Sequence, residues 1–131
     1  MNSLRIYKGD TTPSLDFNIE TMEFFMEGEC RPENVLTCFE PIIKWMDSYV
    51  DWLKNKKSAG RLNFNFKLEY YNSSSAKFIF NIFKQLKVVQ SNGIEVNVFW
   101  FYYLLDEDLL ECGQEYEKIL GLKFHFLALQ E

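Results

Sequence analysis

Residues Arg61 to Tyr71 read RLNFNFKLEYY, and this stretch decides the fold class. Its side chains alternate between apolar and polar, and a β-strand would place the two kinds on opposite faces. The apolar set is Leu62, Phe64, Phe66, Leu68 and Tyr70, and the polar set is Arg61, Asn63, Asn65, Lys67 and Glu69. We therefore predict a strand with one covered face and one face in contact with water.

The segments on either side of this strand switch between extended and helical patterns. Strands are expected at 4–7, 15–18, 21–26, 61–71, 94–103 and 124–129, and helices at about 35–54, 73–90 and 106–120. Gly28 is expected to end the first group of strands. The order βββ-α-β-α-β-α-β predicts an α/β fold, a STAS-like sandwich with a mixed β-sheet and helices mainly on one face.

The first helix carries three boundary signals. Pro32-Glu33-Asn34 is typical of a helix start, with proline in the first turn and an acid near the positive end of the helix dipole. Pro41 falls inside the helical pattern and predicts a kink, or a short helix followed by a long one. Ser58-Ala59-Gly60 is expected to end the helix.

Length and composition narrow the class of protein. A chain of 131 residues predicts a single domain over residues 1–131, and its 47% hydrophobic content excludes intrinsic disorder. Fourteen basic and nineteen acidic residues give a net charge of −5, which argues against nucleic-acid binding. Because the first ten residues are polar and no run approaches 18 apolar residues, we expect no signal peptide, no membrane association and a cytoplasmic location.

Motifs for catalysis, cofactors and metals are missing. The sequence has no glycine-rich phosphate loop, no nucleophile elbow and no HExxH pair, so we predict no cofactor and no catalytic residue. A zinc site is not expected either, because the candidate ligands are few and widely spaced. They are Cys30, Cys38, Cys112 and His125. The acidic run at 106–108 is better explained as the solvated start of a helix than as a cation site.

The segment Asn72-Ser73-Ser74-Ser75-Ala76-Lys77 is the most informative about function. It places hydroxyl groups where a strand ends and a helix begins, and free backbone N–H groups at such a point favour an anion. A phosphorylated serine there would gain about −1.5 to −2 charges in a favourable field. From the spacing alone, a serine that only caps the helix is the favoured interpretation.

At these residues the chain resembles the SiaC family of regulatory phosphoproteins, formerly DUF1987, which regulate biofilm formation and are related in architecture to anti-anti-sigma factors. The resemblance extends over nearly the whole chain and is carried by an ordered set of short motifs. They are Thr12-Pro13 with Leu15-Asp16-Phe17, Gly28 to Asn34, Phe39 to Trp45, Leu68 to Lys77, and Trp100 to Tyr103 followed by the segment 106–113. Cys30 and Arg31 stand where the family usually has serine and tyrosine.

The resemblance implies a phosphorylation switch and no enzymatic activity. It assigns the phosphoacceptor to Ser73, where threonine is commoner in the family, with a serine kinase adding the phosphate and a PP2C-type phosphatase removing it. The unphosphorylated form would bind and activate a signalling partner such as a diguanylate cyclase. Residues implied in contacts with the kinase or the partner are Asn72, Ser74, Ser75, Lys77, Pro32, Glu33 and Asn34.

Two other functions remain open at this point. The chain could be a constitutive protein-binding module that uses the polar strand face and the aromatic residues Trp45, Tyr49 and Trp52 of the first helix. It could also be a small enzyme that uses the acidic run at 106–108 or Cys30, which is expected in a loop beside Arg31 with a lowered pKa.

Overall fold

The structure of the chain, a computed structural model, describes residues 1–56 and 59–130. Its strands are β1 (Leu4–Ile6), β2 (Ser14–Asn18), β3 (Glu23–Cys30), β4 (Arg61–Tyr71), β5 (Glu95–Tyr103) and β6 (Lys123–Leu129). Its helices are α1 (Val35–Lys54), α2 (Ser73–Ser91) and α3 (Glu107–Leu120). The predicted order of elements is confirmed. The expected stop at Ser58-Ala59-Gly60 lies partly outside the described residues.

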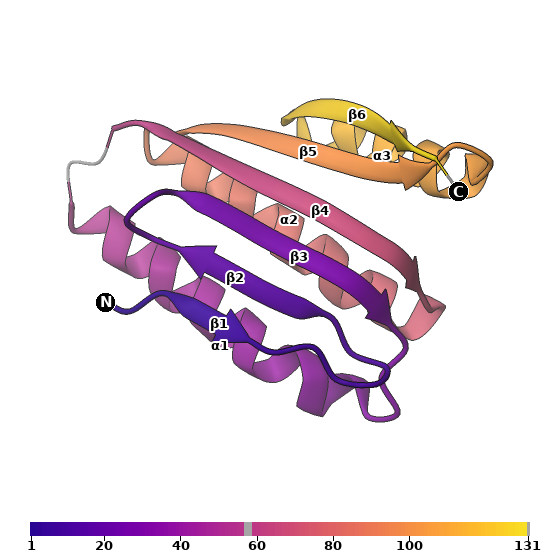
Figure 1. The fold of residues 1–131 in the computed structure, drawn as a ribbon. Coiled ribbons are helices and arrows are strands. Elements are labelled where there is room, and N and C mark those ends of the chain that lie inside the picture. Colours follow the sequence, from indigo (N-terminus) through magenta and orange to yellow (C-terminus); the bar gives the residue numbers. More distant parts are fainter. Residues whose placement is uncertain (57–58, 131) are drawn as a thin grey trace.

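The strands form one mixed sheet in the order β1-β2-β3-β4-β5-β6. The first three strands are antiparallel hairpin partners, whereas β3, β4, β5 and β6 run parallel. All three helices cover the same face of the sheet (Figure 1). Crossovers of one hand that always step in the same direction along a sheet produce this single helical layer. Because α1, α2 and α3 follow β3, β4 and β5, all three begin at the carboxyl edge of the parallel strands.

The covered face of β4 forms the centre of the core, as its alternation predicted. Phe64 and Phe66 are fully buried, and Phe66 stacks on Trp100 of β5 with 4.3 Å between ring centroids. Helix α3 passes over the same indole at Gly113, where an added Cβ would lie 2.7 Å from a Trp100 ring atom. The close approach of α3 to the sheet therefore depends on a glycine at position 113.

The end of β3 differs from the prediction, because Gly28 does not end the strand. Gly28 has a φ of +104°, which glycine tolerates, and β3 continues to Cys30. Its pairing with β4 shifts here, so that Glu69 is an extra residue in β4. This bulge reverses the alternation: Tyr70 is 51% exposed, against prediction, and Tyr71 turns towards the core.

The start of α1 also differs from the prediction. The helix begins after Asn34, whose side chain accepts a hydrogen bond from the Thr37 backbone N–H at 3.1 Å. Pro32 and Glu33 therefore precede the helix, and its first turn holds no acidic residue. Pro41 lies inside one continuous helix of 20 residues, so the alternative of two separate helices is wrong.

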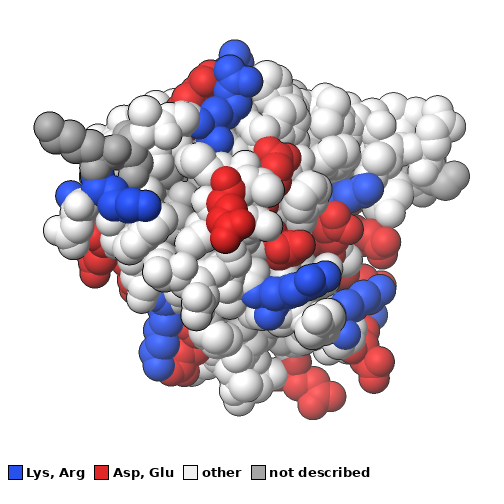
Figure 2. Space-filling model, turned by 60° about the vertical axis from the view of Figure 1, so that its left-hand side comes forward, with Lys and Arg blue, Asp and Glu red and all other residues white. Residues whose placement is uncertain are grey.

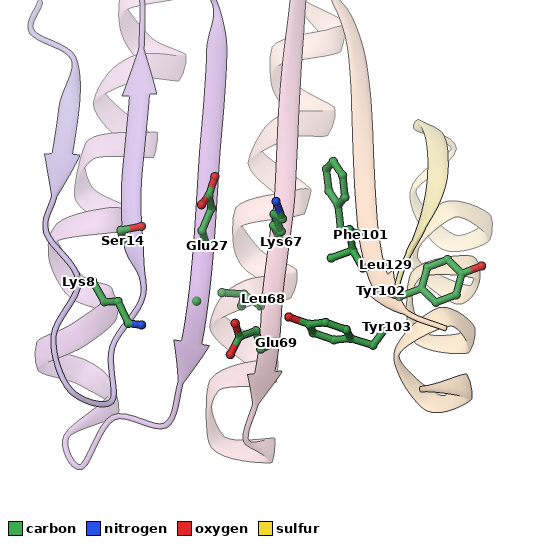
Figure 3. A pocket seen from close by; sticks show the side chains of 11 residues that line it. Lys8, Ser14, Glu27, Lys67, Leu68, Glu69, Phe101, Tyr102, Tyr103 and Leu129 are labelled. Atoms are coloured by element: carbon green, nitrogen blue, oxygen red, sulfur yellow. The ribbon is translucent and has the colours of Figure 1, made fainter. Parts of the chain in front are cut away.

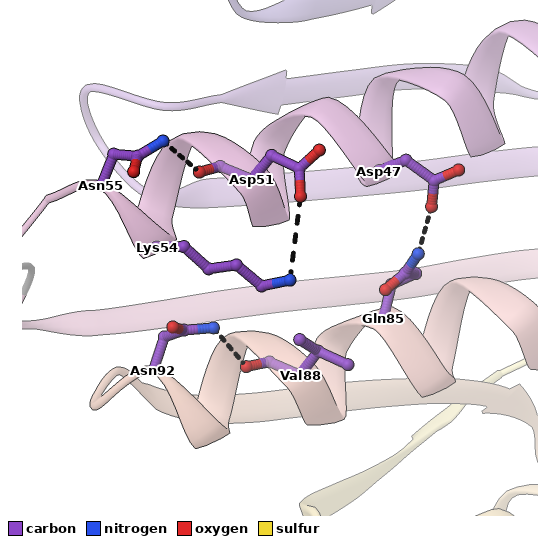
Figure 4. A network of polar contacts seen from close by, with 7 residues as sticks. All are labelled: Asp47, Asp51, Lys54, Asn55, Gln85, Val88 and Asn92. Carbon is purple, nitrogen blue, oxygen red and sulfur yellow. Dashed lines mark hydrogen bonds and ion pairs between the residues drawn. The ribbon is translucent and has the colours of Figure 1, made fainter.

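Polar side chains form contacts between α1 and α2 and also within each of these helices (Figure 4). The Gln85 side chain of α2 donates to the Asp47 carboxylate of α1, while Lys54 and Asp51 form an ion pair within α1 at 3.8 Å. On the face drawn in Figure 2, acidic and basic side chains are interspersed. Among the helices of the described chain, none is long and apolar enough to cross a membrane.

Candidate functional site

The first turn of α2 begins where β4 leaves the sheet, directly after the bulge. Tyr71 packs edge-on against Phe66 with 6.2 Å between centroids, which fixes the direction of the chain. Asn72 then adopts an extended backbone, and its Oδ1 accepts the Ser75 backbone N–H at 3.1 Å. The N-cap of the helix is therefore an asparagine, so the explanation of the serines as plain caps is wrong.

The three serines that follow Asn72 differ in exposure and in hydrogen bonding. Ser73 and Ser74 are exposed, whereas Ser75 is completely buried. The Ser74 hydroxyl donates to Asn72 Oδ1 at 3.1 Å, and the Ser75 hydroxyl accepts from the Cys30 thiol at 3.5 Å. In the described part of the chain, no side chain hydrogen-bonds the Ser73 hydroxyl. Ser73 thus has an accessible oxygen that takes part in no local network.

The charges around Ser73 favour an added anion. Its position as the first residue of α2 lies at the positive end of the helix dipole, next to backbone N–H groups that lack a partner within the helix. The first turn contains no acidic residue, and Lys77 is exposed one turn further on. A phosphate on Ser73 would therefore meet the helix dipole and a cation without a carboxylate in the same turn.

The predicted contact loop before α1 lies beside this turn. The Asn72 backbone N–H donates to the Cys30 carbonyl at 3.2 Å, which joins the end of β4 to the end of β3. Of the residues that follow, Pro32 is buried, and Glu33 and Asn34 are exposed. The structure thus brings the two predicted groups of contact residues to one edge of the sheet.

A hollow of about 240 Å³ lies on the other side of the turn, between the end of β4 and the start of α3. Tyr71 lines it, and its hydroxyl lies 2.8 Å from the Cys112 sulfur. Burial, with a smaller effect of this contact, raises the pKa of Tyr71, so the phenol stays neutral. The carboxylates of Glu69, Asp106 and Asp108 also line the hollow, but nowhere in the described residues do three metal-ligating side chains form a site.

A larger hollow of about 400 Å³ lies on the helix-free face of the sheet (Figure 3). Lys8, Glu27 and Lys67 give it charged walls of both signs, and Phe101 and Tyr103 form its apolar side. Lys67 and Glu69 of the polar strand face line this hollow, whereas none of the residues predicted in the α2 turn or in the loop before α1 does.

The sequence analysis missed the surroundings of Cys30. This residue is the last of β3 and is fully buried, so the expected loop beside Arg31 is wrong. Its pKa is lowered to about 7 by a hydrogen bond from Cys38, with burial opposing and Ser75 assisting, and Arg31 plays no part. Arg31 instead pairs with Glu29 at 2.7 Å. The signal was available in the buried stripe of α2, because Ser75 lies one turn before Ile79 and so faces the core at Cys30.

With this geometry in place, comparison with known proteins identifies the class of protein. Residues 6–129 match the SiaC family of regulatory phosphoproteins, and the chain belongs to this family. It is accordingly a signalling regulator and not an enzyme, which overturns the alternative of a small enzyme.

Individual relatives agree with this assignment. An uncharacterised protein of Pseudomonas aeruginosa (strain UCBPP-PA14) is 24% identical over 131 residues, which cover all of both chains. The chain also resembles SiaC in the crystal structure of diguanylate cyclase SiaD in complex with its activator SiaC from P. aeruginosa. That match has 25% identity and a TM-score of 0.82, and it covers 96% of this chain and 99% of the other. Apo-SiaC from the same organism matches with 23% identity and a TM-score of 0.79, covering 98% of this chain and all of the other, and shares the fold.

Proposed function

We propose that this chain is a phosphorylation-controlled activator in which Ser73 accepts phosphate from a cognate serine kinase. One observation carries the proposal: Ser73 is exposed at the first position of α2, and no side chain in the described chain hydrogen-bonds its hydroxyl. Ser75 is buried and Ser74 donates to Asn72, so neither is an equivalent acceptor.

The partner of the unphosphorylated form is proposed to be a diguanylate cyclase, since the related SiaC is the activator of such an enzyme. Ser74, Lys77, Glu33 and Asn34 are exposed and Asn72 is half-buried, and together they form the surface that would meet the kinase or the cyclase. Pro32 and Ser75 are buried and would support this surface from below. A PP2C-type phosphatase would reverse the modification, and all of these steps would take place in the cytoplasm.

Phosphate at Ser73 would act through charge and hydration at the surface. It adds about −1.5 to −2 charges at neutral pH, and a partner would have to strip water from it. Burying an imperfectly paired charge costs several kcal/mol, and each 1.4 kcal/mol weakens binding about tenfold. The helix dipole and Lys77 stabilise the phosphate in the free protein, so the fold is retained while the partner is released.

Intact-mass measurement after incubation with the cognate kinase and ATP tests the assignment. We expect one phosphate-sized mass gain in the wild type and in Ser74→Ala, and none in Ser73→Ala. Ser74→Ala is the matched control, because it removes a neighbouring exposed hydroxyl. A mass gain that persists in Ser73→Ala, or no gain in the wild type, would contradict the proposal.

A constitutive binding module is the second candidate function, and the helix-free face of the sheet favours it. Phe25 and Leu127 are 37% and 39% exposed there. The aromatic residues of α1 contribute little, since Tyr49 is buried and Trp45 packs on Phe17 and Phe24. This candidate predicts that Ser73→Asp leaves partner affinity unchanged in a pull-down.

A further inference from the structure

The hollow on the helix-free face of the sheet has no part in the proposed switch. Its volume of about 400 Å³ lies within the range of small-molecule sites, and residues near the carboxyl ends of β3, β4 and β5 line it. Four charged side chains reach it: Lys8 from the loop after β1, Glu27 from β3, and Lys67 and Glu69 from β4 (Figure 3). Two cations and two anions give this hollow a balanced charge.

The four charged side chains form no ion pair and no side-chain hydrogen bond in the described part of the chain. The Lys67 ammonium instead lies over the Phe101 ring, 5.3 Å from its centroid. By contrast, Arg61 and Glu95 on the same face of the sheet pair at 3.0 Å. The charges around the hollow are therefore available to a ligand.

The hollow is open because position 28 has no side chain. Gly28 has a φ of +104°, and an added Cβ would lie 3.8 Å from the Lys8 side chain, on the side of the hollow. The bulge opposite Gly28 makes Glu69 an extra residue of β4. Lys8 and Glu69 consequently point towards β3 from its two sides (Figure 3). A cation and an anion thus face the same small space across a glycine.

We propose that this hollow binds a free α-amino acid with an apolar side chain. The carboxylate of the ligand pairs with Lys8 and its ammonium group with Glu69, and hydrogen bonds between charged groups are stronger than those between neutral ones. Glu27 and Lys67 place a second pair of opposite charges beside the first. The apolar side chain of the ligand lies against the aromatic wall that contains Phe101.

The balance of charges selects against other small ligands. A phosphate or a nucleotide would meet the carboxylates of Glu27 and Glu69, and a polyamine would meet the two lysines. A zwitterion can satisfy both signs at once. Because Lys8 and Glu69 are exposed, each ionic contact contributes little by itself, and binding depends on the two contacts together with the apolar wall.

The first test is a titration of the full ¹⁵N-labelled chain with L-phenylalanine and L-leucine, followed through the amide chemical shifts. We expect saturable shifts at residues 27–28 and 67–69, with a Kd of about 1–2 mM for L-phenylalanine, the affinity of an ordinary ligand of its size. Residues 111–118 of α3 should not shift. Glycine, which lacks the apolar side chain, should bind at least about tenfold more weakly. Absence of saturation at 27–28 and 67–69 with both amino acids would overturn the proposal.

The second test combines two variants with two analogues of L-phenylalanine. Lys8→Met should weaken binding of L-phenylalanine by about tenfold, but leave the affinity for phenethylamine, which has no carboxylate, unchanged. Glu69→Gln should weaken L-phenylalanine to a similar extent, but leave the affinity for 3-phenylpropionate, which has no ammonium group, unchanged. A variant that only disturbed the shape of the hollow would lose all three ligands alike, and that result would overturn the assigned contacts.

Lys123→Met is the matched control for Lys8→Met. It removes an exposed lysine from β6 that does not line the hollow, and it should bind L-phenylalanine like the wild type. An equal loss of affinity in Lys123→Met and Lys8→Met would show that net charge, and not the hollow, attracts the ligand, and would overturn the proposal. All of these measurements use unphosphorylated protein without a partner, so their outcome is independent of the assignment of Ser73.

Discussion

The starts of α1, α2 and α3 lie at the same edge of the sheet and are built alike, yet only the start of α2 carries the serine that we propose as the phosphoacceptor. In each, a cap side chain accepts the backbone N–H three residues on, at 3.1 Å from Asn34 and Asn72 and at 3.0 Å from Asp106. The residues after the cap differ. Helix α1 begins with Val35 and Leu36, α2 with Ser73 and Ser74, and α3 with Glu107 and Asp108.

This difference supports the proposal that the start of α2, and not that of α1 or α3, is the modified site. All three helix starts offer unpaired N–H groups and a positive dipole end. At α1 no hydroxyl is present at the first two positions, and at α3 permanent carboxylates already occupy the favourable field. At α2 the field is left without an anion while a free hydroxyl lies within it. Under the proposed function, phosphorylation would add a charge there and dephosphorylation would remove it.

The largest expected effect is on partner affinity. Ser73→Asp should weaken binding of the partner that recognises the unphosphorylated form of this chain by about 100-fold. The reason is that a buried, poorly paired carboxylate costs roughly 2–3 kcal/mol at an interface. Isothermal titration calorimetry with the purified cyclase measures it. Gln114→Glu is the control, because it adds one negative charge on the exposed surface of α3. Equal weakening by both variants would show that net charge, and not the α2 turn, controls binding.

The next effect separates the packing of α3 on the sheet from the start of α2. Gly113→Ala places a Cβ 2.7 Å from the Trp100 ring and should destabilise the fold by about 1–3 kcal/mol through overpacking. Urea denaturation measures the loss. Phosphorylation of Ser73 by the kinase should continue at an unchanged rate below the transition. A large drop in that rate in folded Gly113→Ala would mean that α3 forms part of the switch.

Replacing the two asparagine caps compares α1 and α2 directly. Asn34→Ala and Asn72→Ala should each lower the free energy of unfolding by about 1 kcal/mol, the usual cost of a lost cap. Asn72→Ala should also change the rate of Ser73 phosphorylation, and by more than Asn34→Ala does, because Asn72 Oδ1 accepts hydrogen bonds from both the Ser74 hydroxyl and the Ser75 N–H. A rate change of the same size in Asn34→Ala would indicate that the kinase depends equally on the loop before α1.

Local patterns predicted the fold and the position of the α2 turn. The alternation of β4 from Arg61 to Leu68 and the order of elements follow from the period of apolar residues, which each segment carries by itself. The asparagine and serines between β4 and α2 are a local signal of the same kind. The choice of Ser73 came from the resemblance to a family, because spacing alone favoured a serine that only caps the helix.

Features that depend on two segments far apart in the chain could not be predicted from the sequence. The bulge at Glu69 arises from the pairing of β4 with Gly28 in β3, and the alternation of β4 therefore gave the wrong face for Tyr70. The burial of Cys30 was missed because β3 extends past Gly28 and carries this residue into the core. Both errors have one cause: β3 continues to pair with β4 past Gly28, and neither segment shows this by itself.

The smallest expected effect concerns the helix start itself. If α2 offers a favourable field to an anion, phosphorylation of Ser73 should raise the free energy of unfolding by about 0.3–1 kcal/mol at low salt, the usual contribution of a charge at a helix terminus. Salt screens such an effect, so the gain in the free energy of unfolding should be smaller in 1 M NaCl. Urea denaturation of the phosphorylated and unphosphorylated protein at two salt concentrations measures this gain. Asp108→Asn at α3 is the matched comparison, since it removes an anion from a helix start and should cost a similar amount. If phosphorylation lowered stability at low salt, carboxylates such as Glu69 and Asp106 would outweigh the dipole, and α2 would differ from α3 only in its hydroxyl groups.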